Sequence, residues 1–284
     1  MKSKPPYFGP LMMLSASILF STGGILCKLV PWSALAINGT RNLLASMVIG
    51  AYLLAIRHKL RFNLMILFGA VCMCGVTTLF IMANKLTTAG NTIILQYSAP
   101  IWIILMSFIF LHKKPVRRDV IAIVFVFIGI IFFFLDSIGA GNTLGNILAL
   151  VSGIFYAGLF MLNSLPKADA LSSLFLGQLG TGLIFTPFIV NETDFSAAPI
   201  MAVIALGLFQ VGLAYIFFNL GTKLIPPVTA SIINGLEPVL NPLLVMIFWK
   251  EMFTPLSLIG AVIVLATILI YNIINARSAA KNAA

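Results

Sequence analysis

The sequence predicts an all-α membrane protein with ten transmembrane helices arranged as two inverted five-helix repeats. Three observations support this fold class. Hydrophobic residues make up 61% of the 284 residues and charged residues 8%, and the mean hydropathy is +1.11, whereas a soluble domain carries about a quarter charged residues. Apolar stretches of about 20 residues, long enough to cross a ~30 Å hydrocarbon core, recur along the chain. The second half of the chain also repeats features of the first.

The apolar stretches define ten expected spans with short connections that leave no room for a soluble domain. These spans are residues 8–30, 33–56, 62–83, 90–111, 117–135, 143–162, 170–190, 199–220, 226–249 and 255–275.

The repeat becomes visible when the chain is shifted against itself by 138 residues. Without a gap, this shift aligns Lys85 with Lys223 and Pro100 with Pro238. It maps the third span onto the eighth and the fourth onto the ninth, so each repeat holds five spans. Because five is odd, the second repeat enters from the opposite side of the membrane. We place the repeats at residues 1–137 and 138–284. Many secondary transporters have this architecture, with substrate sites near the midplane at the repeat interface.

Two sequence devices suit close helix packing. Pro100 and Pro238 lie mid-span, where each removes the hydrogen bond to the carbonyl four residues earlier, at Gln96 and Asn234. Such breaks either kink a helix or line a cavity. The sixth span carries a ridge of small residues that permits close backbone approach, formed by Gly141, Gly145, Ala149, Gly153 and Ala157.

The net charge of +10 orients the chain and is not a footprint for nucleic acid. With an internal N-terminus, thirteen of the 17 lysines and arginines fall in inside loops and three in outside loops. This bias predicts cytoplasmic N- and C-termini in a bacterial-type inner membrane. The inside residues are Lys2, Lys4, Arg57, Lys59, Arg61, Lys113, Lys114, Arg117, Arg118, Lys167, Lys223, Arg277 and Lys281, and the outside residues are Lys28, Lys85 and Lys250.

Glu237 is the main candidate functional residue because it lies halfway along the apolar stretch 226–249. A charged side chain at this depth costs roughly 3 kcal/mol or more, so it is kept mainly where it faces a polar cavity or a partner. Helical spacing places it on one face with Ala230, Asn234 and Asn241. The repeat gives it a counterpart in Ala99, and pairs Asn234 with Gln96. We predict substrate-binding residues Glu237, Asn234, Gln96, Asn241 and Tyr156.

Three roles are open to Glu237: it could bind a substrate cation, carry a proton, or accept hydrogen bonds that hold the ninth span in place. It could also pair with a basic residue for packing alone. Arg41, two turns into the second span, is expected to reach the membrane interface as an anchor, in preference to contacting a substrate carboxylate.

Enzyme motifs are absent from the sequence. His58 and His112 lie in basic loops, the three cysteines have no nearby histidine to complete a metal set, and no glycine loop for phosphate followed by Lys-Ser/Thr occurs. We therefore expect no catalytic residues, cofactor or metal, and no transport driven by ATP within this chain.

Several motifs resemble the drug/metabolite transporter superfamily, specifically its EamA-type ten-helix members. The resemblance rests on Phe20–Lys28, Arg41–Ala45, Phe155–Ala157, and Leu236–Val239 with Trp249–Glu251 and Gly260–Ala261. The sequence departs from the family at His112–Lys114, where many members carry Gly-Glu, and at Phe20, where tryptophan is usual. The resemblance implies a central cavity lined by both halves, peripheral fifth and tenth helices, and transport of small metabolites, amino acids prominent among them.

We therefore expect a secondary transporter or facilitator that moves a small organic metabolite by alternating access, with amino-acid export as the leading hypothesis. A transporter of cationic amines or multiple drugs is the second hypothesis. A non-transporting membrane scaffold is the third. Protons are a candidate coupling ion, and the oligomeric state is left open.

Overall fold

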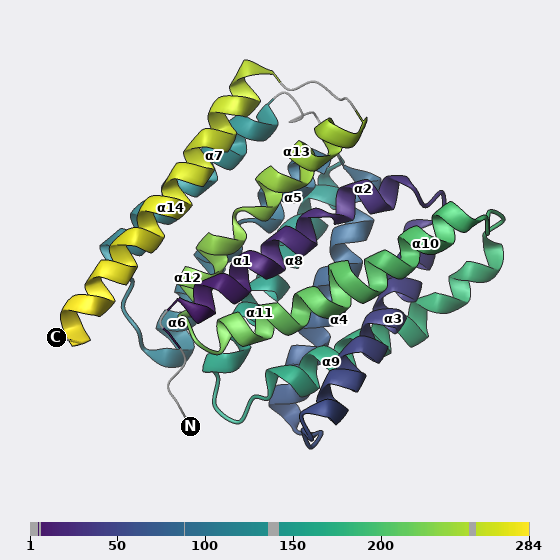
Figure 1. Ribbon diagram of the computed structural model, residues 1–284, viewed down its shortest axis with the longest axis horizontal. Coiled ribbons are helices and arrows are strands. Elements are labelled where there is room, and N and C mark those ends of the chain that lie inside the picture. Colours follow the sequence, from purple (N-terminus) through teal and green to yellow (C-terminus); the bar gives the residue numbers. More distant parts are fainter. Residues whose placement is uncertain (1–4, 6, 88, 136–141, 250–253, 284) are drawn as a thin grey trace.

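The computed structural model describes residues 5, 7–87, 89–135, 142–249 and 254–283, and within these ranges every regular element is a helix (Figure 1). The ten expected spans are all present, which confirms the predicted fold class. The first five are formed by α1 (Phe8–Ser21) with α2 (Gly23–Lys28), α3 (Ala34–Ala55), α4 (Leu64–Leu86), α5 (Ala89–Gln96) with α6 (Ala99–Leu111), and α7 (Arg117–Phe134).

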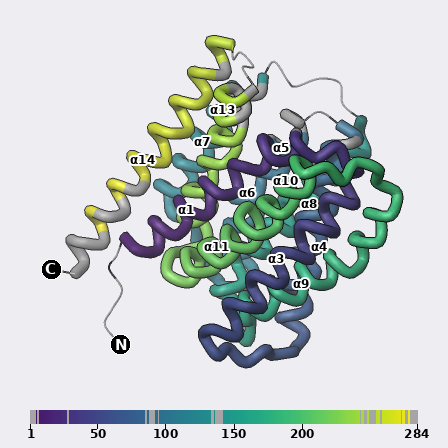
Figure 2. Tube along the Cα trace, turned by 45° about the vertical axis from the view of Figure 1, so that its right-hand side comes forward, coloured from purple at the N-terminus to yellow at the C-terminus, as the bar shows by residue number. Residues whose placement is uncertain are grey.

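The second five spans follow the same plan. They are formed by α8 (Thr143–Met161) with the short η2 (Leu162–Ser164), α9 (Ala170–Phe185) with η3 (Thr186–Asn191), α10 (Ala197–Ala205) with η4 (Leu206–Leu213) and α11 (Ala214–Thr222), α12 (Pro227–Asn234) with α13 (Glu237–Trp249), and α14 (Pro255–Ala283). As an even number of spans requires, α1 begins and α14 ends on the same side of the bundle (Figures 1 and 2).

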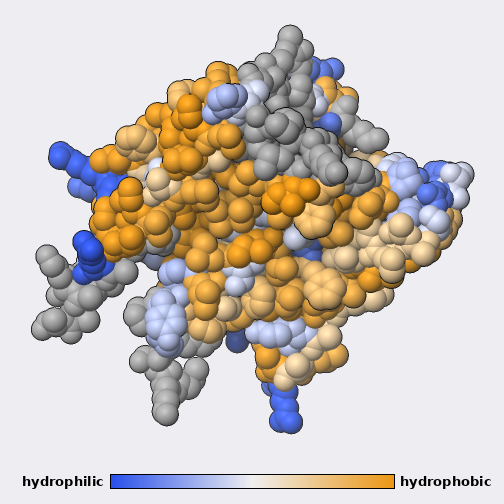
Figure 3. Space-filling model, turned by 45° about the horizontal axis from the view of Figure 1, so that its top comes forward, coloured by the Kyte–Doolittle hydropathy of each residue, from blue (hydrophilic) through white to orange (hydrophobic). Residues whose placement is uncertain are grey.

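Length and composition fit a membrane environment. Five segments of the described chain are long and apolar enough to cross a bilayer: Phe8–Cys27, Leu64–Asn84, Thr143–Ser164, Ala170–Asn191 and Ala197–Thr222. The face seen in Figure 3 is mostly apolar, and hydrophilic residues gather toward its edges. A surface of this kind is suited to lipid contact.

The fourth and ninth spans break at equivalent points. The fourth is interrupted between Gln96 and Ala99, and the ninth between Asn234 and Glu237, at the same 138-residue offset that relates the two halves of the sequence. The cause is the proline that follows each break, which cannot donate the next helical hydrogen bond. One sequence-based assumption is corrected here, because Asn234 and Glu237 belong to two separate half-helices and not to one continuous stripe.

Neighbouring spans accommodate the breaks. The carbonyl of Asn234, which Pro238 leaves without its helical donor, accepts a hydrogen bond from the Tyr97 hydroxyl at 3.3 Å. At the break in the fourth span, Gly153 of α8 packs directly against the backbone, since a Cβ at this position would lie 2.8 Å from the Gln96 carbonyl oxygen.

The small-residue ridge of the sixth span also meets its neighbours as predicted. A Cβ at Gly145 would lie 2.9 Å from the Leu86 and Thr87 side chains, and Ala149 and Ala157 are fully buried. Gly141 lies outside the described residues.

The central bundle is formed mainly by α1, α3, α4, α8, α9 and α11, while α7 and α14 pack against each other at one edge (Figures 1 and 2). The fifth and tenth spans are therefore peripheral, as the family resemblance implied. Residues at the centre of the bundle come from both halves of the chain.

Candidate functional site

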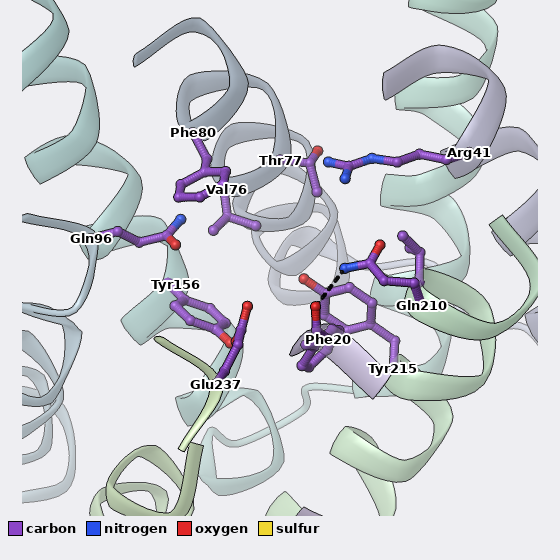
Figure 4. Close-up of a pocket in the computed structure, with 11 residues that line it drawn as sticks. Phe20, Arg41, Val76, Thr77, Phe80, Gln96, Tyr156, Gln210, Tyr215 and Glu237 are labelled. Carbon is purple, nitrogen blue, oxygen red and sulfur yellow. Dashed lines mark hydrogen bonds between the residues drawn. The ribbon is translucent and has the colours of Figure 1, made fainter. Parts of the chain in front are cut away.

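A cavity of about 80 Å³ lies inside the bundle and is lined by spans of both repeats (Figure 4). This volume accommodates several water molecules. Its lining residues are Phe20, Arg41, Val76, Thr77, Phe80, Gln96, Tyr156, Gln210, Val211, Tyr215 and Glu237. Three of the predicted site residues are therefore brought together here: Glu237, Gln96 and Tyr156.

Glu237 occupies the first position of α13, where the helix dipole favours a negative charge. Its Oε2 atom accepts hydrogen bonds from the Tyr97 hydroxyl at 2.7 Å and from Asn234 Nδ2 at 3.2 Å. No hydrogen bond from the described residues reaches Oε1, and none of the described lysines or arginines pairs with the carboxylate. The carboxylate thus has one oxygen held by the protein and one open to a ligand.

Asn234 lies behind the cavity wall, fully buried. Its Nδ2 atom contacts the Tyr156 hydroxyl at 2.8 Å and the Tyr97 hydroxyl at 3.1 Å, and its Oδ1 atom accepts from Ser17 at 3.2 Å. The first, fourth, sixth and ninth spans are joined by this network. Asn234 is therefore placed to orient Glu237 and Tyr156, and it does not line the cavity itself.

Gln96 and Asn241 differ in their surroundings. Gln96 lines the cavity and donates from Nε2 to Ser152 at 3.3 Å. Asn241 lies one turn further along α13 and is not among the lining residues. Direct substrate contact by the predicted residues stays a prediction.

Arg41 stands on the wall away from Glu237, with its guanidinium directed toward Thr77 and the open centre (Figure 4). The expectation that it anchors at the membrane interface is wrong, because α3 turns it into the bundle. Its Nη2 atom donates to Asn38 Oδ1 at 3.2 Å, while Nε is buried and has no hydrogen-bond partner in the described part of the chain. Among the described acids none forms an ion pair with it. A guanidinium within an apolar span is as costly as a carboxylate, so the position of Arg41 in the sequence was already a signal of a cavity-lining residue.

The remaining lining residues come from α1, α4 and the eighth span. Gln210 and Val211 lie in the π-helical turn η4, a widened geometry that often occurs at functional sites. Gln210 Nε2 donates to the Phe20 carbonyl at 3.3 Å, and the Phe20 and Tyr215 rings meet edge to face with centroids 5.0 Å apart. Gln210, Thr77 and Tyr215 were not singled out from the sequence, because the helix packing that turns a side chain toward the cavity cannot be read from local sequence.

Two inverted repeats whose broken helices meet around a polar cavity, inside an otherwise apolar bundle, define a membrane transporter architecture. Residues 7–135 and 143–273 each match the EamA-like transporter family, and the chain belongs to this family. It is a multi-pass membrane transporter of small molecules.

The chain is also similar to two other proteins over most of its length. The chain is 27% identical over 282 residues to the uncharacterized transporter YwfM of Bacillus subtilis (strain 168), with 92% of each chain covered. A solved structure, described only as the crystal structure of a protein, superposes with a TM-score of 0.80 at 17% identity, covering 95% of this chain and 98% of the other. The second similarity shows the fold alone.

Proposed function

We propose that this protein is a secondary transporter for amino acids or closely related zwitterions, which it moves by alternating access through the central cavity between repeats 1–137 and 138–284. The observation that carries the proposal is the placement of Glu237 and Arg41, neither in an ion pair with a described residue, on the wall of one small cavity. Export is the proposed direction, on the strength of the family resemblance.

The charges complement the two ends of an amino acid. The free oxygen of Glu237 suits an ammonium group, and the forked guanidinium of Arg41 suits a carboxylate. Phe20, Val76 and Phe80 supply apolar surface for the substrate side chain. A zwitterion would pair both protein charges at once, which offsets the cost of holding each of them in a poorly solvated site.

A cationic amine is the second candidate substrate, favoured by the aromatic rings beside the acid. Tyr156 and Tyr215 line the same cavity as Glu237, and aromatic faces attract cations. This candidate needs no carboxylate partner, so Arg41 distinguishes the two proposals.

The test compares an amino acid with its decarboxylated amine and its deaminated acid, using binding to the purified protein and flux in proteoliposomes. We expect the amino acid to bind best, and Arg41→Gln to weaken it by roughly 30-fold or more while leaving the amine unchanged, since removing one partner of a buried charge pair costs about 2–5 kcal/mol. Binding of the amine as tightly as the amino acid, with Arg41→Gln neutral for both, would establish the second candidate instead.

A further inference from the structure

A second hollow, of about 470 Å³, lies on the outside of the bundle between α7 and α14. Its walls are mostly hydrocarbon, and the hydroxyls that line it are already bonded within the protein: Thr267 donates to the Ile263 carbonyl at 2.7 Å, and the Tyr271 hydroxyl donates to Asp119 at 2.8 Å and contacts Thr229. The lining residues are Arg118, Ile121, Ala122, Phe125, Ile263, Ala266, Thr267, Ile270, Tyr271 and Ile274.

The groove faces the lipid phase and not the transport cavity. Side chains on both of its rims are about half exposed, at 57% for Ile121, 51% for Phe125 and 56% for Ile270. Its residues share none with the central cavity. From Ile274 to Ile263 it runs about 16 Å along α14 at ~1.5 Å per residue, which is close to half of a ~30 Å hydrocarbon core. One acyl chain of a single leaflet therefore matches its length.

Among the described residues, positive charge gathers at one end of the groove. Arg118, at the first turn of α7, is itself a lining residue and donates to Ser278 at 3.3 Å, so it lies at the C-terminal end of α14. The residues around this end are basic and exposed, namely Lys113, Lys114, Arg117 and Arg277. The nearby acid, Asp119, is 3.9 Å from Arg118 Nε and accepts from Tyr271 at 2.8 Å.

We propose that this groove binds an anionic phospholipid, with one acyl chain between α7 and α14 and the headgroup phosphate at Arg118. The leaflet is the one in which α7 begins, which the distribution of basic residues predicts to be cytoplasmic. Basic pockets between transmembrane helices are suited to such headgroups. The charge at one end and the hydrocarbon walls match the two parts of a lipid, and a soluble anion would not fill the apolar part.

The test uses the full-length protein in detergent, with dioleoyl phosphatidylglycerol or dioleoyl phosphatidylcholine added to the micelles. Lipid retained by the protein is measured by native mass spectrometry, and lipid-dependent thermal stabilisation gives the apparent affinity. Two variants change the site: Arg118→Gln removes the charge, and Ala266→Leu adds three carbon atoms to the wall and narrows the groove. Each has a matched control, Arg117→Gln on the exposed neighbouring residue and Ala51→Leu at an exposed alanine of α3.

We expect phosphatidylglycerol to be preferred by the wild type and by both controls. Arg118→Gln should weaken this preference about fivefold, the effect of one basic residue at a membrane surface, and Ala266→Leu should lower the retention of both lipids. If Arg118→Gln and Arg117→Gln weaken the preference for phosphatidylglycerol equally, the preference comes from general surface charge, and the proposed site is overturned. Wild-type lipid retention by Ala266→Leu would also overturn the proposed lipid site. So would a dimer that forms without lipid and that Ala266→Leu disrupts, because the groove would then bind a second copy of the chain.

Discussion

Substituting Glu237 with glutamine separates the three roles open to this side chain. Glutamine has nearly the same volume and keeps an oxygen that can accept from Tyr97 and Asn234, the donors at 2.7 and 3.2 Å. The substitution therefore removes the charge with little change in packing. Since none of the described cations pairs with the carboxylate, no counter-charge of the protein is left stranded.

The expected loss of substrate affinity follows from the ion pair that a substrate ammonium would form with Glu237. If the free oxygen of Glu237 binds a substrate ammonium, removing the charge costs about 2–5 kcal/mol, or roughly 30-fold to several thousand-fold in Kd. Amino acids and amines should lose affinity together, whereas a deaminated acid should bind as it does to the wild type. Glu192→Gln provides the matched control, since this partly exposed acid lies outside the cavity and accepts a hydrogen bond from the Ser33 backbone N–H at 2.9 Å.

Two assays decide the outcome. Calorimetric titration reports affinity, and proteoliposomes with an imposed pH gradient report proton-driven accumulation across a range of pH. Wild-type affinity in Glu237→Gln would refute the ammonium site. If the variant also concentrates substrate from a proton gradient, proton carriage by this residue is wrong as well. If Glu237→Gln lowers thermal stability but keeps substrate binding and proton-driven accumulation, the role of Glu237 is to accept the hydrogen bonds that hold the ninth span in place.

Two further predictions concern the breaks in the fourth and ninth spans. Gly153→Ala should lower the melting temperature, because the added Cβ would lie 2.8 Å from the Gln96 carbonyl oxygen and such overpacking costs about 1–3 kcal/mol. The control is Gly180→Ala, which has nothing within 4 Å and should be neutral or stabilising by up to about 1 kcal/mol. Equal melting temperatures of the two variants would show that the close approach at Gly153 is unimportant. Tyr97→Phe removes the hydroxyl that donates to Glu237 and to the Asn234 carbonyl, and should lower the free energy of unfolding by about 1–3 kcal/mol and also weaken substrate binding. Unchanged stability in denaturation and unchanged affinity in binding assays would contradict a role for these hydrogen bonds in holding Glu237.

Most of the fold could be predicted from the sequence because its causes are local. Span length follows from runs of apolar residues, and the breaks after Gln96 and Asn234 follow from prolines whose missing N–H acts within one turn. The offset that aligns Lys85 with Lys223 also relates the two breaks, so the repeat can be recognised from residue spacing alone. Glu237 stood out because an acid in an apolar run is costly wherever the helix points.

The composition of the cavity was decided by tertiary structure alone. Whether Arg41 faces lipid, the membrane interface or the centre depends on how α3 is rotated against α4, α9 and η4, which is set by contacts between segments far apart in the chain. The packing of η4, α11 and α13 against the other spans likewise decides that Gln210 and Tyr215 line the cavity and that Asn241 does not. Hydropathy and helical period determine that a residue lies within a span, while the packing of all ten spans determines what it faces.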